Sequence, residues 1–257
     1  MIYIVTNRKQ STFNYLKPYA TPIIQKENGW SKTKIKKSDT IMYYFQYEVN
    51  VSKIPKLPLH SKMIGHPKGV LACRNKKEMR RLFIEKGINV PKTWFKIEDA
   101  VIPFIARPRY HHMGKLLFVA RTEEEKSIMM NDPAIGKDWY FSELLDLTHE
   151  FRIILFNYEV ILAYEFPLYG SVEETVLKRL EYRGTNLAAK QIPTNIPRHY
   201  EDLAIKAMKT IELGFGGLDL LVDRKGNIYI SEVNNSPTMY KVIRDALKKA
   251  IIKYSEE

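Results

Sequence analysis

The segment from Gly217 to Ser236 narrows the possible folds of this chain more than any other part of its sequence. It reads GLDLLVD, then RKG, then NIYISEVNNS, and both arms alternate apolar and polar residues around an Asp-Arg-Lys-Gly turn. This pattern predicts a β-hairpin. Whether the loop has two or three residues, Asp219 lies opposite Glu232 or one position from it. Asn234 is two residues beyond Glu232 and shares its face.

Two carboxylates and one amide oxygen therefore converge on one side of the predicted hairpin. Adjacent carboxylates on a mostly apolar ribbon repel each other by about 1 kcal/mol or more unless a cation lies between them. A set of hard oxygen ligands favours Mg²⁺ or Mn²⁺ over zinc, and such magnesium sites are usually completed by substrate phosphates. The alternative is that Asp219 and Glu232 are separate surface residues paired with lysines.

Three helices are predicted around the hairpin. The first follows Asn75, which can cap it, with Glu78 three residues on and Gly87 as its stop. The second covers residues 200–213 and ends at Gly214, and the third covers about 239–254. All three carry apolar residues at helical spacing, which indicates amphipathic helices packed on a core.

Strand patterns fill the region between the first two helices. INVPKTWF is typical of a short edge strand, and AVIPFIARPRY with KLLFVAR predicts an antiparallel ribbon whose polar tip holds His111, His112 and Gly114. A helix-sized gap follows. FRIILFN and EVILAYEF, joined at Asn157-Tyr158, predict a second ribbon.

The N-terminal part is predicted to be a small α/β unit, with strands at residues 2–5 and 41–45. Residues 51–69 contain prolines at 55, 58 and 67, and we interpret this stretch as the connection out of that unit. Residues 1–66 hold 11 Lys and Arg but 3 Asp and Glu. This excess points to an anionic partner, whether nucleic acid, a phosphorylated nucleotide or an acidic peptide, or else to a solvated lysine-rich face.

Composition excludes several classes of protein. The only cysteine, Cys73, cannot form an internal disulfide or a multi-thiolate zinc site. No run of about 18 apolar residues occurs, and the N-terminus lacks the pattern of a signal peptide, so we expect a cytoplasmic protein that does not enter a membrane. A chain of 257 residues is long enough for a large core or two unequal domains.

The block LAIKAMKTIELGFGGLDLLVDRKGNIYISEVNNSPTM resembles the C-terminal signature of the ATP-grasp superfamily. In that family an Asp, a Glu and an Asn at this spacing hold two Mg²⁺ ions that bridge the ATP phosphates. The resemblance covers about residues 69–240 and is nearest to ribosomal-protein glutamate ligases and small phage-type ligases. It implies an α+β ATP-grasp fold over 67–257, with a flap subdomain at about 67–140 and a metal-binding subdomain at about 141–257. A small basic α/β domain over 1–66 would precede it.

The resemblance also implies roles for individual residues. Asp219, Glu232 and Asn234 would hold the metal, and Lys76, with Lys77 as the fallback, would reach the phosphates. Arg107 matches a position where the family has a lysine, and Arg152 matches an arginine near the phosphates and the acyl group. Adenine would be contacted by Glu143, Leu144 and Leu145, the ribose by Glu150, and a phosphate or the metal shell by Asn186, with Arg183 a weaker candidate.

Two further departures from the family pattern lie in loops. The flap has one glycine where the family often has several, and Ala188-Ala189-Lys190 replaces the usual double glycine after Asn186-Leu187. Both changes put the local backbone geometry of those loops in question, because glycine supplies conformations that other residues rarely adopt.

The activity implied is an ATP- and Mg²⁺-dependent ligase that joins an acid to an amine through an acylphosphate, with an amino acid, a peptide or a protein tail as substrate. A different class is a basic nucleic-acid-binding protein with a degenerate ATP-grasp domain. In it the aromatic residues near Lys32–Lys37 would stack on bases, namely Tyr43, Tyr44, Phe45 and Tyr47. A third reading combines them as a ligase whose acceptor is a polyanion or an acidic peptide.

Overall fold

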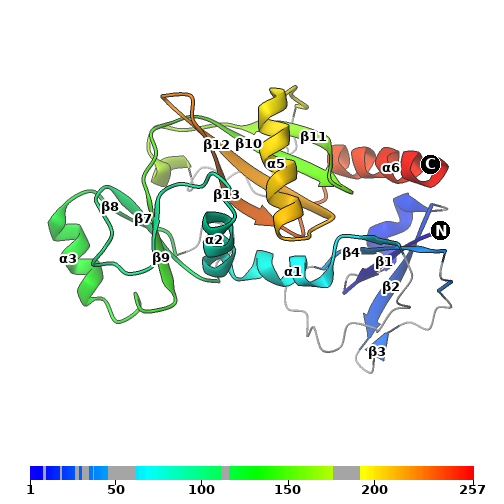
Figure 1. Ribbon diagram of the computed structural model, residues 1–257, viewed down its shortest axis with the longest axis horizontal. Coiled ribbons are helices and arrows are strands. Elements are labelled where there is room, and N and C mark those ends of the chain that lie inside the picture. Colours follow the sequence, from blue (N-terminus) through cyan, green and yellow to red (C-terminus); the bar gives the residue numbers. More distant parts are fainter. Residues whose placement is uncertain are drawn as a thin grey trace.

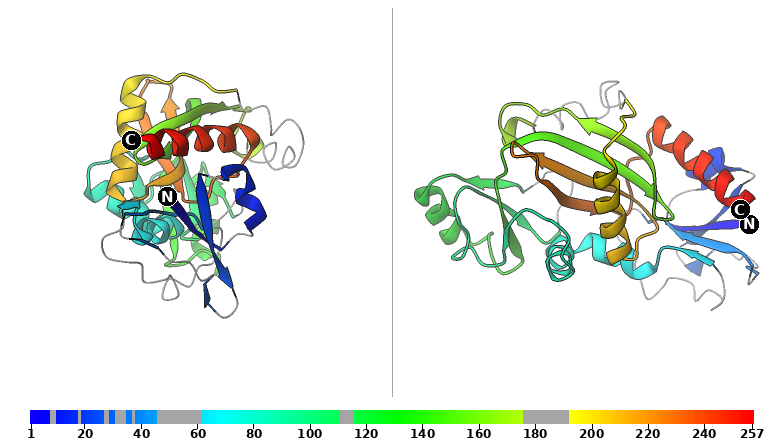
Figure 2. Two further views of the ribbon diagram at one scale, coloured as in Figure 1. Left: turned by 90° about the vertical axis from the view of Figure 1, so that its right-hand side faces the viewer. Right: turned by 45° about the horizontal axis from the view of Figure 1, so that its top comes forward.

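A computed structural model describes residues 1–7, 10–17, 19–26, 29–30, 35–36, 38–45, 62–110, 116–175 and 192–257. Within these residues the chain forms three sheets that follow one another along the long axis of the molecule (Figure 1). The two chain ends lie together at one end of the molecule, beside the N-terminal sheet (Figures 1 and 2).

The N-terminal sheet has the strand order β3-β2-β1-β4-β5. Its strands are β1 Ile2–Thr6, β2 Ala20–Lys26, β3 Gly29–Trp30, β4 Thr40–Tyr43 and β5 Lys62–Ile64, with the 3-10 helix η1 Gln10–Leu16 after β1. The pairs β1–β2, β1–β4 and β4–β5 are parallel. The strands predicted at 2–5 and 41–45 are confirmed, although the second begins one residue earlier and ends at Tyr43.

The predicted connection over 51–69 is wrong at its C-terminal end. Residues 62–64 form β5, and helix α1 Pro67–Arg74 begins at the last of the three prolines. Proline is tolerated in the first turn of a helix, where its missing N–H has no partner to lose. His66 caps this helix, because its Nδ1 accepts a hydrogen bond of 3.1 Å from Lys68 N.

The central sheet is antiparallel, with the order β11-β10-β12-β13. Its strands are β10 Leu147–Phe156, β11 Glu159–Phe166, β12 Phe215–Asp223 and β13 Ile228–Asn234. The predicted ribbon turn at Asn157-Tyr158 is confirmed, since both residues have positive φ, as a tight hairpin requires. The helices α5 Arg198–Thr210 and α6 Lys241–Glu256 match the other two predicted helices within a few residues.

Alternating side chains give the central sheet two different faces. On one face Leu218, Leu220 and Val233 pack with α5 through Ala204, Ala207 and Met208. On the other face Ile154, Phe156 and Phe215 pack with α6 through Ile243, Leu247 and Ile251. Helix α6 covers only the end of this second face, at the side of the N-terminal sheet (Figure 2). Further along the same face lie Arg152, Asp219 and Glu232, with the Phe166 ring of β11 beside Arg152.

The third sheet has the order β6-β9-β7-β8 and forms the end of the molecule opposite the chain termini (Figure 1). Its strands are β6 Thr93–Trp94, β7 Phe104–Pro108, β8 Phe118–Ala120 and β9 Trp139–Glu143. The predicted β7–β8 ribbon and the β6 edge strand are confirmed. Helix α3 Glu123–Asn131 fills the helix-sized gap, and Thr122 and Glu125 form its capping box.

Helices α1 and α2 lie between the outer sheets, and α2 Lys76–Glu85 runs beside β13 (Figure 1). The predicted cap is confirmed, because Asn75 Oδ1 accepts a hydrogen bond of 3.2 Å from Glu78 N. None of the helices within the described ranges combines the length and apolar character needed to cross a membrane.

Two glycines bring separate parts of the backbone into direct contact. Gly65 follows β5 with φ +78°, and an added Cβ on Gly214 would overlap the backbone nitrogen of Gly65. Beside this contact His66 N donates a hydrogen bond of 2.7 Å to Glu212 O. These contacts join the N-terminal sheet to the loop that leads into β12. The backbones are so close that a side chain at residue 214 would overlap Gly65.

We expect Gly214→Ala to lower the free energy of unfolding by about 2 to 4 kcal/mol, because the backbones must move apart to admit a methyl group. Urea denaturation measures this loss. Gly136→Ala is the matched control, since a Cβ at Gly136 meets nothing within 4 Å. Equal stability of the two variants would contradict the close packing described here.

Candidate active site

A row of polar side chains crosses the central sheet on the face that α6 leaves open. Arg152 of β10 is the register partner of Asp219 of β12, and Asp219 is the partner of Glu232 of β13. Glu150 and Asn234 lie two residues from Arg152 and Glu232 and share the same face. The structure therefore brings together the three predicted metal ligands with two more of the predicted site residues.

A β-bulge sets the pairing of the two carboxylates. The hairpin loop is closed by Asp223 N, which donates a hydrogen bond of 3.0 Å to Asn227 O. From there the register runs regularly to Leu220 opposite Ile230, and then shifts so that Asp219 faces Glu232. Ser231 is the extra residue. The sequence leaves open two positions for Glu232, and the structure selects the one directly opposite Asp219.

Arg152 and Asp219 form a two-point ion pair. Arg152 Nε donates to Asp219 Oδ1, and Arg152 NH2 donates to Oδ2 at 2.9 Å. Burial raises the pKa of Asp219, and the nearby Glu232 and Glu150 carboxylates push it the same way, while Arg152 opposes both. Burial disfavours the charged form of Arg152, yet the Asp219 carboxylate outweighs it and the pKa of Arg152 is raised. Arg152 therefore has a charge partner inside the polar row.

Lys76 provides a positive charge beside the Glu232 carboxylate. Its Nζ lies 3.3 Å from Glu232 Oε1 and donates hydrogen bonds to Asn234 Oδ1 at 3.0 Å and Val233 O at 2.8 Å. Lys77, the fallback candidate, instead donates to Lys137 O. Among these two lysines only Lys76 contacts the predicted metal ligands.

Arg80 lies one turn further along α2 and was not among the predicted site residues. It is 3% exposed, and its guanidinium donates to Ile230 O at 3.3 Å and to Ser231 O at 2.7 Å. A sequence signal for it exists. Arg80 is four residues from Lys76 and lies between Met79 and Phe83 on the buried stripe of α2, where an unpaired arginine would be costly.

Arg107 approaches from the third sheet. It is the register partner of Tyr140, whose ring centroid lies 6.0 Å from Arg80 Cζ. Among the residues that the structure describes, the buried Arg107 Nε has no hydrogen-bond partner. Burial lowers the pKa of Arg80, and the positive charge of Arg107 lowers it further. An orphaned donor beside a second guanidinium suits an anion such as phosphate.

Residues 143–145 link the third sheet to the central one. Glu143 ends β9, and β10 begins at Leu147. Glu143 Oε1 accepts a hydrogen bond of 2.9 Å from Lys92 N, and Leu144 N donates to Pro103 O at 3.0 Å. The Glu143 carboxylate therefore holds the residue that precedes β6, and the N–H of Leu144 is bonded to the loop before β7.

Several predicted residues fall outside the described ranges. They are Asn186 and Arg183 with the Ala188-Ala189-Lys190 stretch, His111, His112 and Gly114 of the flap, and Lys32, Lys34 and Lys37 of the basic segment with Tyr47 near it.

The donor set of the polar row fits a hard divalent cation. The Lys76 ammonium contacts the side-chain oxygens of Glu232 and Asn234, and the Arg152 guanidinium contacts those of Asp219. These oxygens are therefore already placed to interact with positive charge. Within the described residues no group of three or more His, Cys, Asp or Glu could hold a metal by itself. Two carboxylates and an amide would leave coordination positions for phosphate oxygens and water, as Mg²⁺ prefers.

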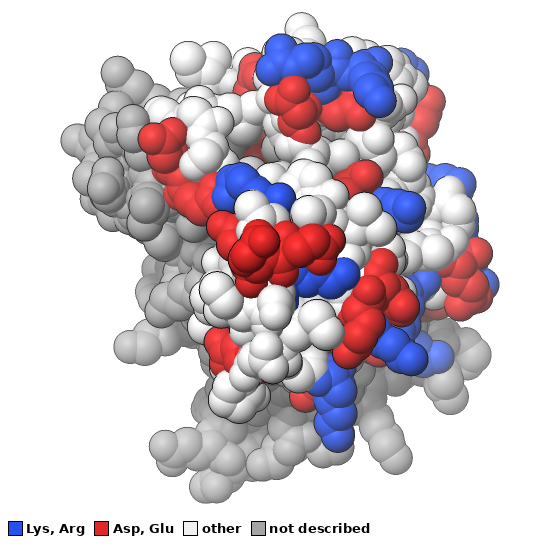
Figure 3. Space-filling view, turned by 90° about the vertical axis from the view of Figure 1, so that its left-hand side faces the viewer, with Lys and Arg blue, Asp and Glu red and all other residues white. Residues whose placement is uncertain are grey.

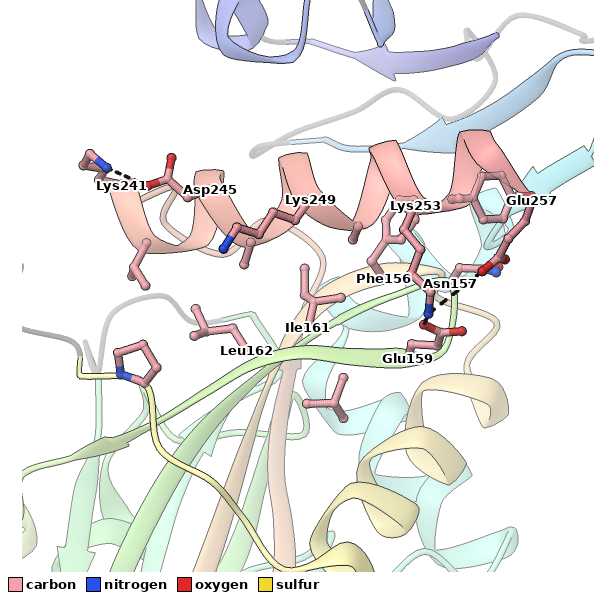
Figure 4. A pocket seen from close by; sticks show the side chains of 16 residues that line it. Phe156, Asn157, Glu159, Ile161, Leu162, Lys241, Asp245, Lys249, Lys253 and Glu257 are labelled. Atoms are coloured by element: carbon pink, nitrogen blue, oxygen red, sulfur yellow. Dashed lines mark hydrogen bonds and ion pairs between the residues drawn. The ribbon is translucent and has the colours of Figure 1, made fainter.

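A hollow lies away from this row, between α6 and β11 (Figure 4). Its volume is about 910 Å³, and its lining shares no residue with the polar row. The pairs Lys241–Asp245 and Lys253–Glu159 lie along it. The residues of the polar row therefore lie outside this hollow.

The end of the molecule that carries α3 has a mixed surface. Figure 3 looks onto this end and shows acidic and basic side chains interspersed on it. Helix α3 contributes Glu123, Glu124 and Glu125 there. The described residues on this face do not form a continuous basic surface of the kind that a nucleic-acid backbone prefers.

Comparison with known proteins identifies the family. Residues 73–254 match the RimK-like ATP-grasp domain, so the chain belongs to this family and is an ATP-dependent ligase with the predicted ATP-grasp fold. A search of curated proteins finds no match.

Solved structures share this fold over nearly the whole chain. One is an ATP-grasp ligase from Chryseobacterium gregarium that is associated with ribosomally made peptides and was solved with ADP and with leader and core peptides. It is 15% identical to this chain with a TM-score of 0.68, and the match covers 98% of this chain and 96% of that one. A macrocyclase from Microcystis aeruginosa, bound with its precursor peptide, is 11% identical with a TM-score of 0.62, covering 98% and 100%. N5-carboxyaminoimidazole ribonucleotide synthetase from Thermotoga maritima is 12% identical with a TM-score of 0.62, covering 98% and 75%.

We expect Arg152→Met to lower the free energy of unfolding by about 3 to 5 kcal/mol, because it leaves a buried carboxylate unpaired. Adding Asp219→Asn should restore at least part of this loss, since the unpaired charge disappears. Urea denaturation of both variants measures the effect.

Arg121→Met is the control for this pair. Arg121 also pairs with a carboxylate, that of Glu173, but both side chains are exposed, so its loss should cost about 1 kcal/mol or less. Arg152→Met as stable as Arg121→Met would show that the buried pair does not contribute as described.

Proposed function

We propose that this chain is an ATP- and Mg²⁺-dependent carboxylate-amine ligase that forms an amide bond through an acylphosphate. The observation that carries the proposal is the convergence of Asp219, Glu232 and Asn234 on one sheet face, bordered by Lys76 and Arg152. Together with the orphaned donor of Arg107 these groups suit a metal-bound triphosphate.

In this proposal Asp219, Glu232 and Asn234 hold the metal, which when bound neutralises charge on the transferred phosphoryl group. Lys76 and Arg107 hold phosphate oxygens, and Arg152 holds the oxygen of the acylphosphate. The chain need supply little covalent chemistry, because phosphoryl transfer depends on positioning and charge stabilisation. A carboxylate attacks the γ-phosphate and releases ADP, and an amine then displaces phosphate to form the amide.

The nucleotide base would lie at the linker between the third and central sheets. Backbone groups of Glu143, Leu144 and Leu145 would contact adenine, and Glu150 would accept from the ribose hydroxyls. Support comes from their placement, since the linker joins the two sheets and Glu150 lies in the polar row. Asn186 is proposed as a phosphate or metal-shell contact on the sequence resemblance alone.

We assign residues 1–66 to a small basic α/β domain and 67–257 to the ATP-grasp domain, divided at about 140/141. Two observations support the first division: β5 ends at Ile64 and α1 begins at Pro67. A peptide is the substrate class we favour, because two of the similar structures hold peptides. The positive charge of residues 1–66 would suit an acidic segment of such a peptide.

The nucleic-acid alternative has less support. Tyr44 and Phe45 are fully buried, and Tyr43 is 5% exposed, so these rings pack in the core and are not presented to bases. We retain the proposal of a ligase whose acceptor is a polyanion or an acidic peptide. Binding such an acceptor requires positive charge on the N-terminal domain but no exposed aromatic rings.

We expect Glu232→Gln to reduce ATP consumption about 100-fold or more, because the amide keeps the shape of the side chain but loses the charge that holds the cation. ADP release in the presence of Mg²⁺ and a panel of amino acids and peptides is the measurement, and mass analysis identifies any product.

Glu78→Gln provides the matched control, since Glu78 lies on the exposed side of α2 and pairs with Arg81. Circular dichroism should show both variants folded. A Glu232→Gln variant that releases ADP at the rate of the unmodified protein would contradict the proposal.

A further inference from the structure

The bulge at Ser231 decides which face of the sheet Glu232 occupies. If the regular pairing of Leu220 with Ile230 continued, Ser231 would face Asp219 and Glu232 would face Leu218. Leu218 is fully buried on the face that packs against α5. A shift of one residue sends every following side chain to the opposite face. The extra residue is therefore what keeps Glu232 and Asn234 in the polar row.

Arg80 contacts the backbone at this bulge. Successive carbonyls of a regular strand point to opposite edges, yet Arg80 donates to both Ile230 O and Ser231 O. One planar guanidinium can span these two acceptors only where the strand is irregular. Among the described strands β13 is the edge of its sheet, so its outer backbone is held by groups outside the sheet. Ile230 N donates a hydrogen bond of 2.8 Å to Asn89 O, and Arg80 binds the carbonyls at the bulge.

We infer that Arg80 is a positioning residue that holds the Ser231 bulge and so keeps Glu232 beside Asp219 in the metal site. The inference rests on the proposed function, because it concerns the geometry of the proposed metal ligands. Arg80 acts through the backbone of β13, because its guanidinium donates to the main-chain carbonyls of Ile230 and Ser231 at the bulge.

The chain offers a matched control in the next residue. Arg81 carries the same side chain on the same helix, but it is half exposed and pairs with Glu78. Arg80→Met and Arg81→Met remove equal charge from α2, and only the first removes the contacts with Ile230 and Ser231.

Binding of Mn²⁺ to the full-length protein with ADP, followed by electron paramagnetic resonance, tests the inference without turnover. We expect Arg80→Met to weaken Mn²⁺ binding at least tenfold, Arg81→Met to change it less than twofold, and Arg80→Lys to fall between. ADP affinity in the presence of EDTA should stay within threefold for all variants, since the contacts to Ile230 and Ser231 concern the metal ligands.

Deleting Ser231 tests whether Arg80 acts by holding the bulge or only through its positive charge. Without this residue a regular register already places Glu232 opposite Asp219, so Arg80→Met should weaken Mn²⁺ binding less than threefold in that background. Equal losses in both backgrounds, or unchanged Mn²⁺ binding by Arg80→Met, would overturn the inference.

The two proposals fail in different ways. Wild-type protein that binds no Mn²⁺ with ADP contradicts the proposed metal site itself, whereas wild-type binding retained in Arg80→Met contradicts only the role of Arg80. Circular dichroism reports whether each variant is folded. Should Arg80→Met not fold, Arg80→Lys with and without Ser231 provides the same comparison.

Discussion

The facing carboxylates of Asp219 and Glu232 are the constraint on which the rest of the structure depends. They lie on adjacent strands of a mostly buried sheet, where two negative charges repel each other and lose hydration. Each is matched by a cation from a different element, Arg152 from β10 and Lys76 from α2. A divalent ion and its phosphates would therefore enter a site whose charges are already balanced, and would compete with both side chains for the same oxygens.

The central sheet supports this site by dividing its surfaces. One face is apolar along its length and packs on α5, while the other is apolar only where α6 covers it. On β10 the change occurs between Ile154 and Arg152, two residues apart on the same face. Hydrophobic burial thus anchors the sheet at one end and leaves the polar row open to the third sheet.

The N-terminal sheet is joined to the site through the loop after β13. Asn235 Nδ2 donates a hydrogen bond of 2.8 Å to Phe45 O, and Tyr44 OH donates one of 3.2 Å to Pro237 O. Asn235 directly follows the predicted ligand Asn234. The residues that follow β4 are therefore hydrogen-bonded to the loop that follows Asn234.

Sequence alone determined the elements whose signals are local. Alternation around a turn predicts the β12–β13 hairpin, a capping pattern predicts α2, and ligand spacing predicts which oxygens meet. Tertiary structure decided the rest. The bulge at Ser231, the choice of Lys76 over Lys77 and the burial of Arg80 all depend on how α2 packs against β13. Adjacent residues on a helix point about 100° apart, so only the position of the neighbouring strand settles which of them reaches the site.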